Sequence, residues 1–138
     1  MKSIDIFYKS YAKDFKLLNY SLQSLFKNIT GFERIYVVIP KDDLETFFID
    51  FHDLLKHNKI FIKTIEEYGD PYIFQQICKI NAHKYSNADY ILFSDSDIIF
   101  DHPVNVQDLI KDDKPEILYT PYDKVDSAIC WKEPTEHF

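Results

Sequence analysis

Apolar residues along the chain fall into two kinds of run that alternate with each other. Short continuous runs rich in β-branched and aromatic residues predict buried strands at 4–8, 34–39, 60–65 and 90–93. Between them, apolar residues recur at helical spacing and predict helices over about 14–29, 42–55 and 71–85. Beyond Pro103 the pattern weakens, and it predicts a short helix near 104–110 and a strand near 117–119.

Local signals mark several of these boundaries. Thr30 and Gly31 end the first helix, and Asp42 and Asp43 are expected to cap the second. Pro71 fits the first position of the third helix, because a proline there forfeits no helical hydrogen bond. On that helix the spacing places four side chains on one face: Ile73, Ile77, Ile80 and Lys84.

The alternation of strands and helices predicts an α/β fold. We expect a single domain over residues 1–138, with a mainly parallel sheet flanked by helices on both faces. A chain of 138 residues with 46% apolar side chains has enough material for one core. In such sheets the ligand lies beyond the carboxyl ends of the strands. The ends of the first and fourth strands should therefore carry the chemistry.

The fourth strand runs into the acidic triplet Asp95-Ser96-Asp97, which divides an otherwise apolar run from Tyr90 to Phe100. Sixteen aspartates would produce an Asp-x-Asp about twice by chance, so the motif gains its weight from this setting. Two ionised carboxylates in such a place cost several kcal/mol unless something compensates, and a bound divalent cation would do so. The alternative is that Asp95 and Asp97 cap turns at the strand end.

A site made only of oxygen ligands favours a hard metal ion, Mg²⁺ or Mn²⁺. Such an ion is held by one or two carboxylates and completed by substrate phosphates and water. Asp97 is the expected direct ligand, and Asp95 would orient a metal-bound water or the ribose hydroxyls of a nucleotide. The ion would accept charge as a nucleoside diphosphate departs.

The acidic balance of the chain narrows the range of partners. A net charge of −7 argues against general affinity for nucleic acid or anionic membranes, which need a surplus of Lys and Arg. An acidic protein normally binds a phosphate-bearing substrate through a divalent cation. Cys78 and Cys130 lie among apolar or aromatic residues and are expected to be buried, reduced thiols. Because the sequence shows no apolar leader and no membrane span, the expected location is the cytoplasm.

Three segments together resemble a known family. The strand followed by the Ser-Asp-Ser-Asp segment at 94–97 looks like the Asp-x-Asp region of glycosyltransferases with the GT-A fold. The segment 72–79 resembles the aromatic, Gln-Gln, Lys helix that precedes this motif in small bacterial and viral GT-A-like sequences, and 9–14 is similar to their first loop. The matches span about residues 4–103, in the right order. The resemblance implies a Rossmann-like core that binds a nucleoside-diphosphate sugar and transfers the sugar to an unknown acceptor. It also implies uridine as the base and a bacterial or virus-infected cell as the setting.

In that fold the loop after the first strand holds the base and ribose of the donor. The resemblance therefore makes five residues candidates for the donor site: Phe7, Tyr8, Ser10, Tyr11 and Asp14. Tyr11 would stack on uracil, and Asp14 would accept a hydrogen bond from its ring nitrogen. The alternatives are that Phe7 and Tyr8 belong to the core and that Asp14 caps the first helix.

Residues of the upstream helix and of the triplet complete the predicted donor site. Gln76 and Lys79 are three apart, share a helix face, and would point together towards a sugar or phosphate. For Lys79 the alternative is an exposed surface charge. Asp95 and Ser96 are the remaining donor-site candidates.

The chain departs from the GT-A pattern after the triplet. That fold places the acceptor site, the catalytic base of inverting members and often a third metal ligand beyond the Asp-x-Asp, whereas 41 residues of the 138 follow Asp97. The acceptor-binding part is expected to be short or absent after about residue 104, and a partner chain in a homo-oligomer would then complete the site. The candidates for the missing roles are His102 or His137 as a third ligand, Asp123, Asp126, Glu133 or Glu136 as a base, and Trp131 as an acceptor platform. The alternative is an ordinary surface position for the histidines and acids, and a core position for Trp131.

Two other functions fit parts of the sequence. One is a donor-binding module that holds metal and nucleotide sugar but transfers nothing, or hydrolyses the donor slowly. The other is a phosphatase of the haloacid-dehalogenase type, which also carries Asp-x-Asp after an apolar strand. There the motif closes the first strand, and a Thr or Val usually stands where this chain has Ile99. The glycosyltransferase is therefore the leading hypothesis.

Overall fold

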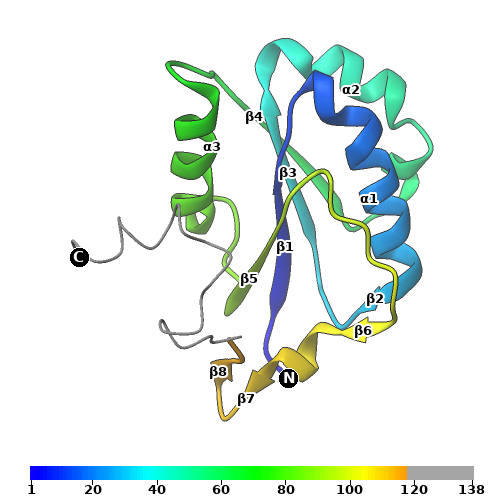
Figure 1. The fold of residues 1–138 in the computed structure, drawn as a ribbon, viewed down its shortest axis with the longest axis vertical. Coiled ribbons are helices and arrows are strands. Elements are labelled where there is room, and N and C mark those ends of the chain that lie inside the picture. The colour runs from blue at the N-terminus through cyan, green and yellow to red at the C-terminus, as the bar shows by residue number, and fades with distance from the viewer. Residues whose placement is uncertain (118–138) are drawn as a thin grey trace, which may run out of the picture.

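The computed structural model describes residues 1–117 and places a parallel four-stranded sheet at the centre of the molecule (Figure 1). Its strands are β1 (Ile4–Lys9), β3 (Ile35–Pro40), β4 (Ile60–Ile65) and β5 (Tyr90–Ser94). They lie in the order β4-β3-β1-β5, and every neighbouring pair is parallel. All four correspond to predicted strands, and the predicted α/β class is confirmed.

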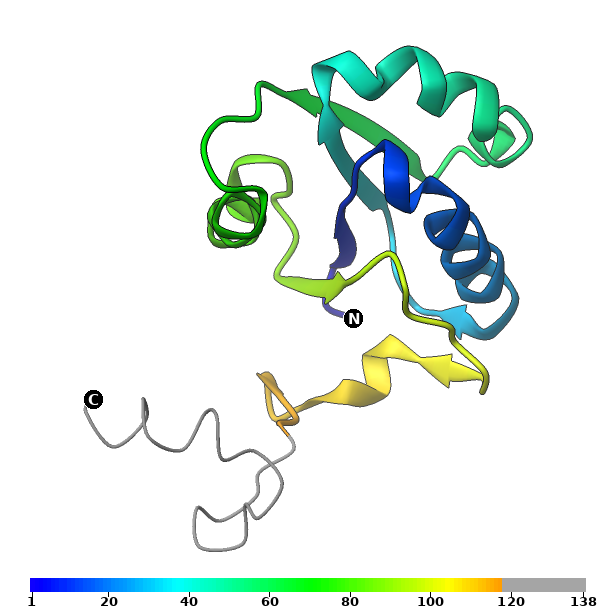
Figure 2. The same cartoon turned by 45° about the horizontal axis from the view of Figure 1, so that its top comes forward.

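Helices cover both faces of the sheet. α1 (Phe15–Asn28) and α2 (Leu44–Asp50) lie on one face, and α3 (Pro71–Ile80) lies on the other, as Figure 2 shows. Along the chain α1 lies between β1 and β3, α2 between β3 and β4, and α3 between β4 and β5. Each helix thus belongs to a crossover between parallel strands, which is how such sheets are built.

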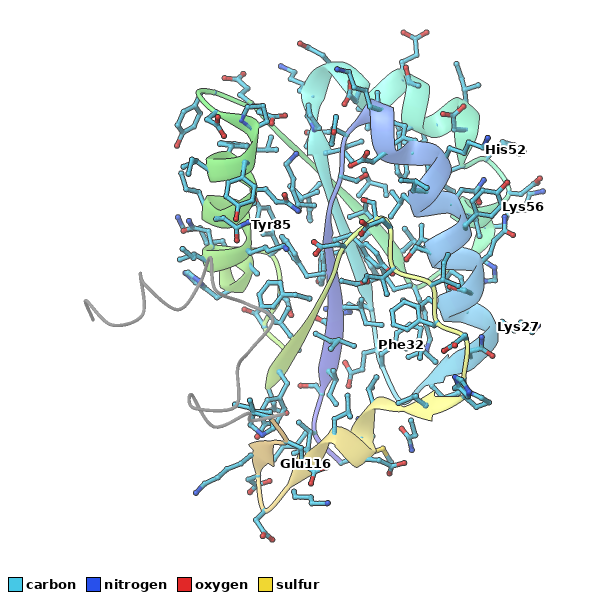
Figure 3. The ribbon with its side chains drawn as sticks, in the orientation of Figure 1. Lys27, Phe32, His52, Lys56, Tyr85 and Glu116 are labelled. Atoms are coloured by element: carbon cyan, nitrogen blue, oxygen red, sulfur yellow. The ribbon has the colours of Figure 1, made fainter. Side chains whose placement is uncertain are left out.

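Two apolar clusters hold these layers together. The larger lies between the sheet and helices α1 and α2, and the smaller lies on the α3 face. Figure 3 labels Phe32, which belongs to the larger cluster, and Tyr85, which packs against the smaller one. Successive residues of a strand point to opposite faces, so Phe7 enters the smaller cluster and Tyr8 the larger. Because β1 is a central strand with helices on both sides, all six of its residues are buried.

The second predicted helix is shorter than its pattern suggested. A 3₁₀ turn, Lys41–Asp43, leads into α2, which ends at Asp50 rather than near residue 55. Neither Asp42 nor Asp43 accepts a hydrogen bond from the start of the helix. Asp43 does occupy the predicted N-cap position of α2, but it makes no capping hydrogen bond, because its carboxylate accepts a 2.7 Å hydrogen bond from the backbone N–H of Ala12 instead. The carboxylate thereby ties down the loop after β1, where the first predicted site residues lie.

The third predicted helix starts at Pro71, as expected, but ends early. It stops at Ile80, and a 3₁₀ turn over Ala82–Lys84 replaces the continuation to residue 85. Phe74 and Cys78 are its buried side chains. The apolar side chains of the predicted face are exposed: Ile73, Ile77 and Ile80.

Short elements follow β5. The two-residue strands form two pairs: β2 (Ile29–Thr30) with β6 (Val104–Asn105), and β7 (Ile110–Lys111) with β8 (Lys114–Pro115). The predicted helix near 104–110 is a single 3₁₀ turn, Val106–Leu109. Ile117 is not part of a strand, and the rest of the predicted strand near 117–119 lies outside the described residues. Within residues 1–117, no helix combines the length and apolar character needed to cross a membrane.

Candidate functional site

The loops that follow β1 and β5 lie side by side, as expected from the ends of two neighbouring parallel strands. Tyr8 is opposite Ser94 near the carboxyl ends of the pair. Just beyond, the hydroxyl of Ser96 donates a 2.9 Å hydrogen bond to Oγ of Ser10, and both serines are buried. The acidic triplet and the first loop therefore belong to one site.

A pocket of about 710 Å³ opens at this edge of the sheet. Figure 1 shows the first turns of α1 and α3 on opposite sides of the end of β1. The pocket is lined by Lys9, Tyr11, Lys13, Asp14, Leu17, Glu67, Pro71, Tyr72, Gln75, Asp95, Ser96 and Asp97. A volume of this order accommodates a nucleotide-sized ligand. A more open hollow of about 820 Å³ lies along α2, but neither the triplet nor the first loop borders it.

Asp95 is held by two side chains of α3. The Lys79 ammonium lies 2.7 Å from its Oδ1 in an ion pair, and the Gln75 amide nitrogen donates to the same oxygen at 3.3 Å. Lys79 keeps 22% of its side chain exposed, so it is neither a free surface charge nor a deeply buried one. These contacts fix the position of Asp95 at the pocket and balance its charge.

Asp14 and Asp97 lie close enough to repel each other. Partial burial raises the pKa of Asp14, the Asp97 carboxylate raises it further, and the Lys9 ammonium acts in the opposite direction. Asp14 occupies the N-cap position of α1 but makes no capping hydrogen bond. Its carboxylate is therefore available to bind a ligand in the pocket. A pair of carboxylates in mutual repulsion attracts a cation.

Lys9 is the main site residue that the sequence did not single out. Its side chain is only 4% exposed, and its ammonium donates a 3.1 Å hydrogen bond to the Ser10 carbonyl. Glu67, in the loop before α3, lies 3.7 Å away as its ion-pair partner. A lysine at the end of a central strand was the available signal, because such a cation is rarely buried without a compensating partner.

Five of the nine predicted donor-site residues do not line the pocket. Two of them, Ser10 and Lys79, contact it indirectly through Ser96 and Asp95. Phe7 and Tyr8 are fully buried in the core, which corresponds to the alternative considered for them. The Tyr8 hydroxyl bonds to Ser21 at 3.0 Å, and burial raises the pKa of this phenol. Gln76 does not line the pocket, whereas Gln75 does. The i, i+4 spacing of Gln75 and Lys79 would have identified the correct face of the helix.

The oxygen donors fit a hard divalent ion that binds together with a phosphate ligand. Within residues 1–117, no three His, Cys, Asp or Glu side chains gather closely enough to hold a metal by themselves. In nucleotide sites, however, Mg²⁺ is held by one or two carboxylates and by phosphates and water. Asp97 and Asp14 both line the pocket and could form such a pair, while Asp95 is engaged by Lys79.

Among the described residues, His102 and Cys78 do not line this pocket. His102 is exposed, and its Nδ1 lies 2.7 Å from Oδ1 of Asp101. Cys78 is a buried free thiol, as predicted, and burial raises its pKa. The remaining sequence candidates lie outside the described residues: Asp123, Asp126, Cys130, Trp131, Glu133, Glu136 and His137.

Comparisons with known proteins add a family and one distant structural likeness. The model of a family described as "Family of unknown function (DUF6492)" matches residues 2–134. No curated protein matches the chain. Among solved structures, the chain is similar to residues 1–349 of S. aureus TarS, with 20% identity and a TM-score of 0.48. The match covers 69% of this chain and 27% of the TarS chain, so this chain spans about a quarter of that structure.

Proposed function

The chain belongs to DUF6492, a family of unknown function, and from the geometry of its site we propose that it is a metal-dependent glycosyltransferase. It binds a nucleoside-diphosphate sugar, with uridine as the base, and transfers the sugar to an acceptor. One observation carries this proposal. The first loop and the acidic triplet, about 80 residues apart in the sequence, meet in one pocket at the carboxyl edge of a parallel sheet.

The charge of the pocket supports the proposed dependence on a metal ion. Four carboxylates and three ammonium groups lie in or beside it: Asp14, Glu67, Asp95 and Asp97, and Lys9, Lys13 and Lys79. The acids outnumber the bases by one, so the pocket alone disfavours a diphosphate. One bound divalent cation would reverse the sign and favour it.

Asp97 would hold this ion, with Asp14 as the second carboxylate. The proximity of Asp14 to Asp97 favours this role over a hydrogen bond to uracil. When bound, Mn²⁺ or Mg²⁺ supplies Lewis-acid stabilisation of the departing diphosphate. In the transfer, an acceptor oxygen bonds to the anomeric carbon and the bond from that carbon to the diphosphate breaks. The electron pair stays on the diphosphate, and the acceptor proton passes to a base or to water.

Other side chains position the donor. Lys79 and Gln75 hold Asp95 in place to accept hydrogen bonds from the ribose hydroxyls. Tyr11, 41% exposed at the pocket rim, is available to stack on the base. Lys9 would supply a fixed positive charge to the phosphates, and burial in a site of low dielectric strengthens its attraction for them.

The phosphatase hypothesis fits the structure less well. The Asp-x-Asp of that class follows the first, central strand, whereas here it follows β5, at the edge of the four-stranded sheet and last of its strands along the chain. The donor-binding module shares the pocket with the transferase, so the two differ only in turnover.

Calorimetry with UDP, GDP and CMP, each with Mn²⁺ and with EDTA, tests the proposal. We expect one diphosphate, UDP, to bind in the presence of Mn²⁺ and not in EDTA. The Asp97→Asn variant, which keeps the shape of the side chain and removes its charge, should lose this binding. The matched control is Asp101→Asn, because Asp101 is exposed and does not line the pocket.

The outcomes separate the candidate functions. Binding that is independent of metal, or the absence of any nucleotide binding, would exclude the proposal. Release of phosphate from simple phosphomonoesters would favour the phosphatase. A UDP-sugar that is bound but only hydrolysed slowly, whatever acceptor is offered, would indicate the binding module.

A further inference from the structure

Exposed tyrosine rings stand at the rim of the pocket on two sides. Tyr11 lies in the first loop and Tyr72 in the first turn of α3, and both line the pocket. Tyr72 is 61% exposed, so it contributes little to the core. A large apolar ring with a polar tip at a wet site is suited to bind a ligand face. The base accounts for Tyr11, whereas Tyr72 has no part in the donor site described above.

The backbone of Tyr72 is rigidly held. Pro71 begins α3, and the Asp70 carboxylate accepts hydrogen bonds from the backbone N–H groups of Tyr72 and Ile73, at 2.9 and 3.1 Å. A ring on such a fixed backbone binds with little loss of conformational entropy. Because Asp70 already occupies the helix N-terminus, this end of α3 is not available to a phosphate.

Polar groups suited to sugar hydroxyls line the same pocket as this ring. Glu67 is held near the Lys9 ammonium and keeps 25% of its side chain exposed. Gln75 donates its amide N–H to Asp95, which leaves its carbonyl oxygen free to accept a hydrogen bond. A sugar ring presents an apolar C–H face for stacking and hydroxyls at its edge. Tyr72, Glu67 and Gln75 match this combination, which a purely apolar ligand would not use.

We propose that Tyr72, Glu67 and Gln75 form the acceptor subsite and that the acceptor is a carbohydrate. Its ring stacks on Tyr72, and its hydroxyls bind Glu67 and Gln75. This inference rests on the proposed function, since it places the acceptor across the pocket from the base-binding ring of Tyr11. It also places the acceptor-binding residues before the triplet in the sequence, whereas the resemblance to the GT-A pattern implies an acceptor site after it.

Saturation-transfer NMR tests the subsite with simple probes. The methyl glycosides of glucose, galactose, mannose and N-acetylglucosamine are titrated onto the full chain in the presence of UDP and Mn²⁺. At least one glycoside should bind, with the strongest transfer to its ring C–H protons. Tyr72→Ala should weaken this affinity about two- to tenfold, the range expected for loss of one ring contact. Tyr72→Phe should retain it.

Two controls keep the result interpretable. Tyr20→Ala removes a similarly exposed ring, at 53%, that does not line the pocket, and it should bind the glycoside like the wild type. Calorimetry should show that UDP binds all variants equally. Three results would overturn the inference. In the first, the wild type binds UDP but no glycoside. In the second, Tyr72→Ala binds the glycoside as well as the wild type does, and in the third, Tyr72→Ala loses UDP binding as well. Failure of the wild type to bind UDP at all would instead refute the proposed function.

Discussion

Replacing Lys9 with methionine should remove a fixed charge from the site while leaving the fold intact. The lysine side chain is 4% exposed, and methionine fills a similar apolar volume. Its partner Glu67 is 3.7 Å away and 25% exposed, so water can solvate it once the ammonium is gone. The cost of burying the ammonium disappears at the same time. We expect the free energy of unfolding to change by less than about 1 kcal/mol.

The loss in ligand affinity should be much larger. An ammonium about 4 Å from a phosphate charge attracts it by about 4 kcal/mol at the effective dielectric constant of a protein surface. Desolvation and compensation by water reduce the net contribution of such a charged contact to about 1.5–3 kcal/mol. The dissociation constant for UDP in the presence of Mn²⁺ should therefore rise about 10- to 100-fold in Lys9→Met.

Calorimetry with UDP and Mn²⁺, paired with thermal unfolding, measures both effects. Lys13→Met is the matched control, because Lys13 lines the same pocket but is exposed. Its effect on affinity should stay below about threefold and should vanish at high salt. A twofold change in affinity is about the noise of such a titration. If the folded Lys9→Met protein bound UDP within twofold of the wild type, the role given to Lys9 would be refuted.

Three further predictions concern the fold and its titrating groups. Leu22→Ala should lower the free energy of unfolding by about 2–5 kcal/mol, because Leu22 is fully buried between α1 and the sheet. Chemical denaturation measures this change, and a value below about 1 kcal/mol would contradict the packing. Asp5→Ala should cost about 1–3 kcal/mol, since the buried Asp5 carboxylate accepts the hydroxyl of Ser86; an unchanged melting curve would show that this contact stabilises nothing. In a Cys130→Ser background, alkylation of Cys78 should be slow at neutral pH, because burial raises the pKa of the thiol and keeps it in the unreactive protonated form. The rate should rise only at a pH above the usual pKa range of thiols. Rapid labelling of the folded protein at pH 7 would argue against the burial of Cys78.

The strands could be predicted from the sequence because their runs are short, apolar and bounded by turns. The helix ends were harder to predict, because they depend on tertiary contacts. Asp43 illustrates the difficulty: its place before an apolar run predicts a helix cap, yet the folded chain brings the N–H of Ala12 within its reach. Such a contact, 31 residues away in sequence, outweighs the local preference.

The position of the candidate site could be predicted from the order of the strands, but its side chains could not. Parallel strands bring their carboxyl ends to one edge, so the first loop and the triplet were expected to meet. Which side chains reach the pocket depends on details that hydropathy does not resolve. Phe7 and Tyr8 resembled ligand contacts but fill the two clusters on either side of a central strand. The burial of Lys9 could not be predicted either, because its ion-pair partner Glu67 lies in a loop far along the chain.

Diffraction from crystals grown with Mn²⁺ and UDP, recorded where manganese scatters anomalously, would show whether one metal ion joins Asp97 to the nucleotide. We expect one strong anomalous peak in the pocket, within coordinating distance of an Asp97 carboxylate oxygen and of a diphosphate oxygen. Asp14 should be the second protein ligand, and Asp95 should remain paired with Lys79. UDP bound in the pocket without manganese, or manganese bound away from Asp97, would contradict the account.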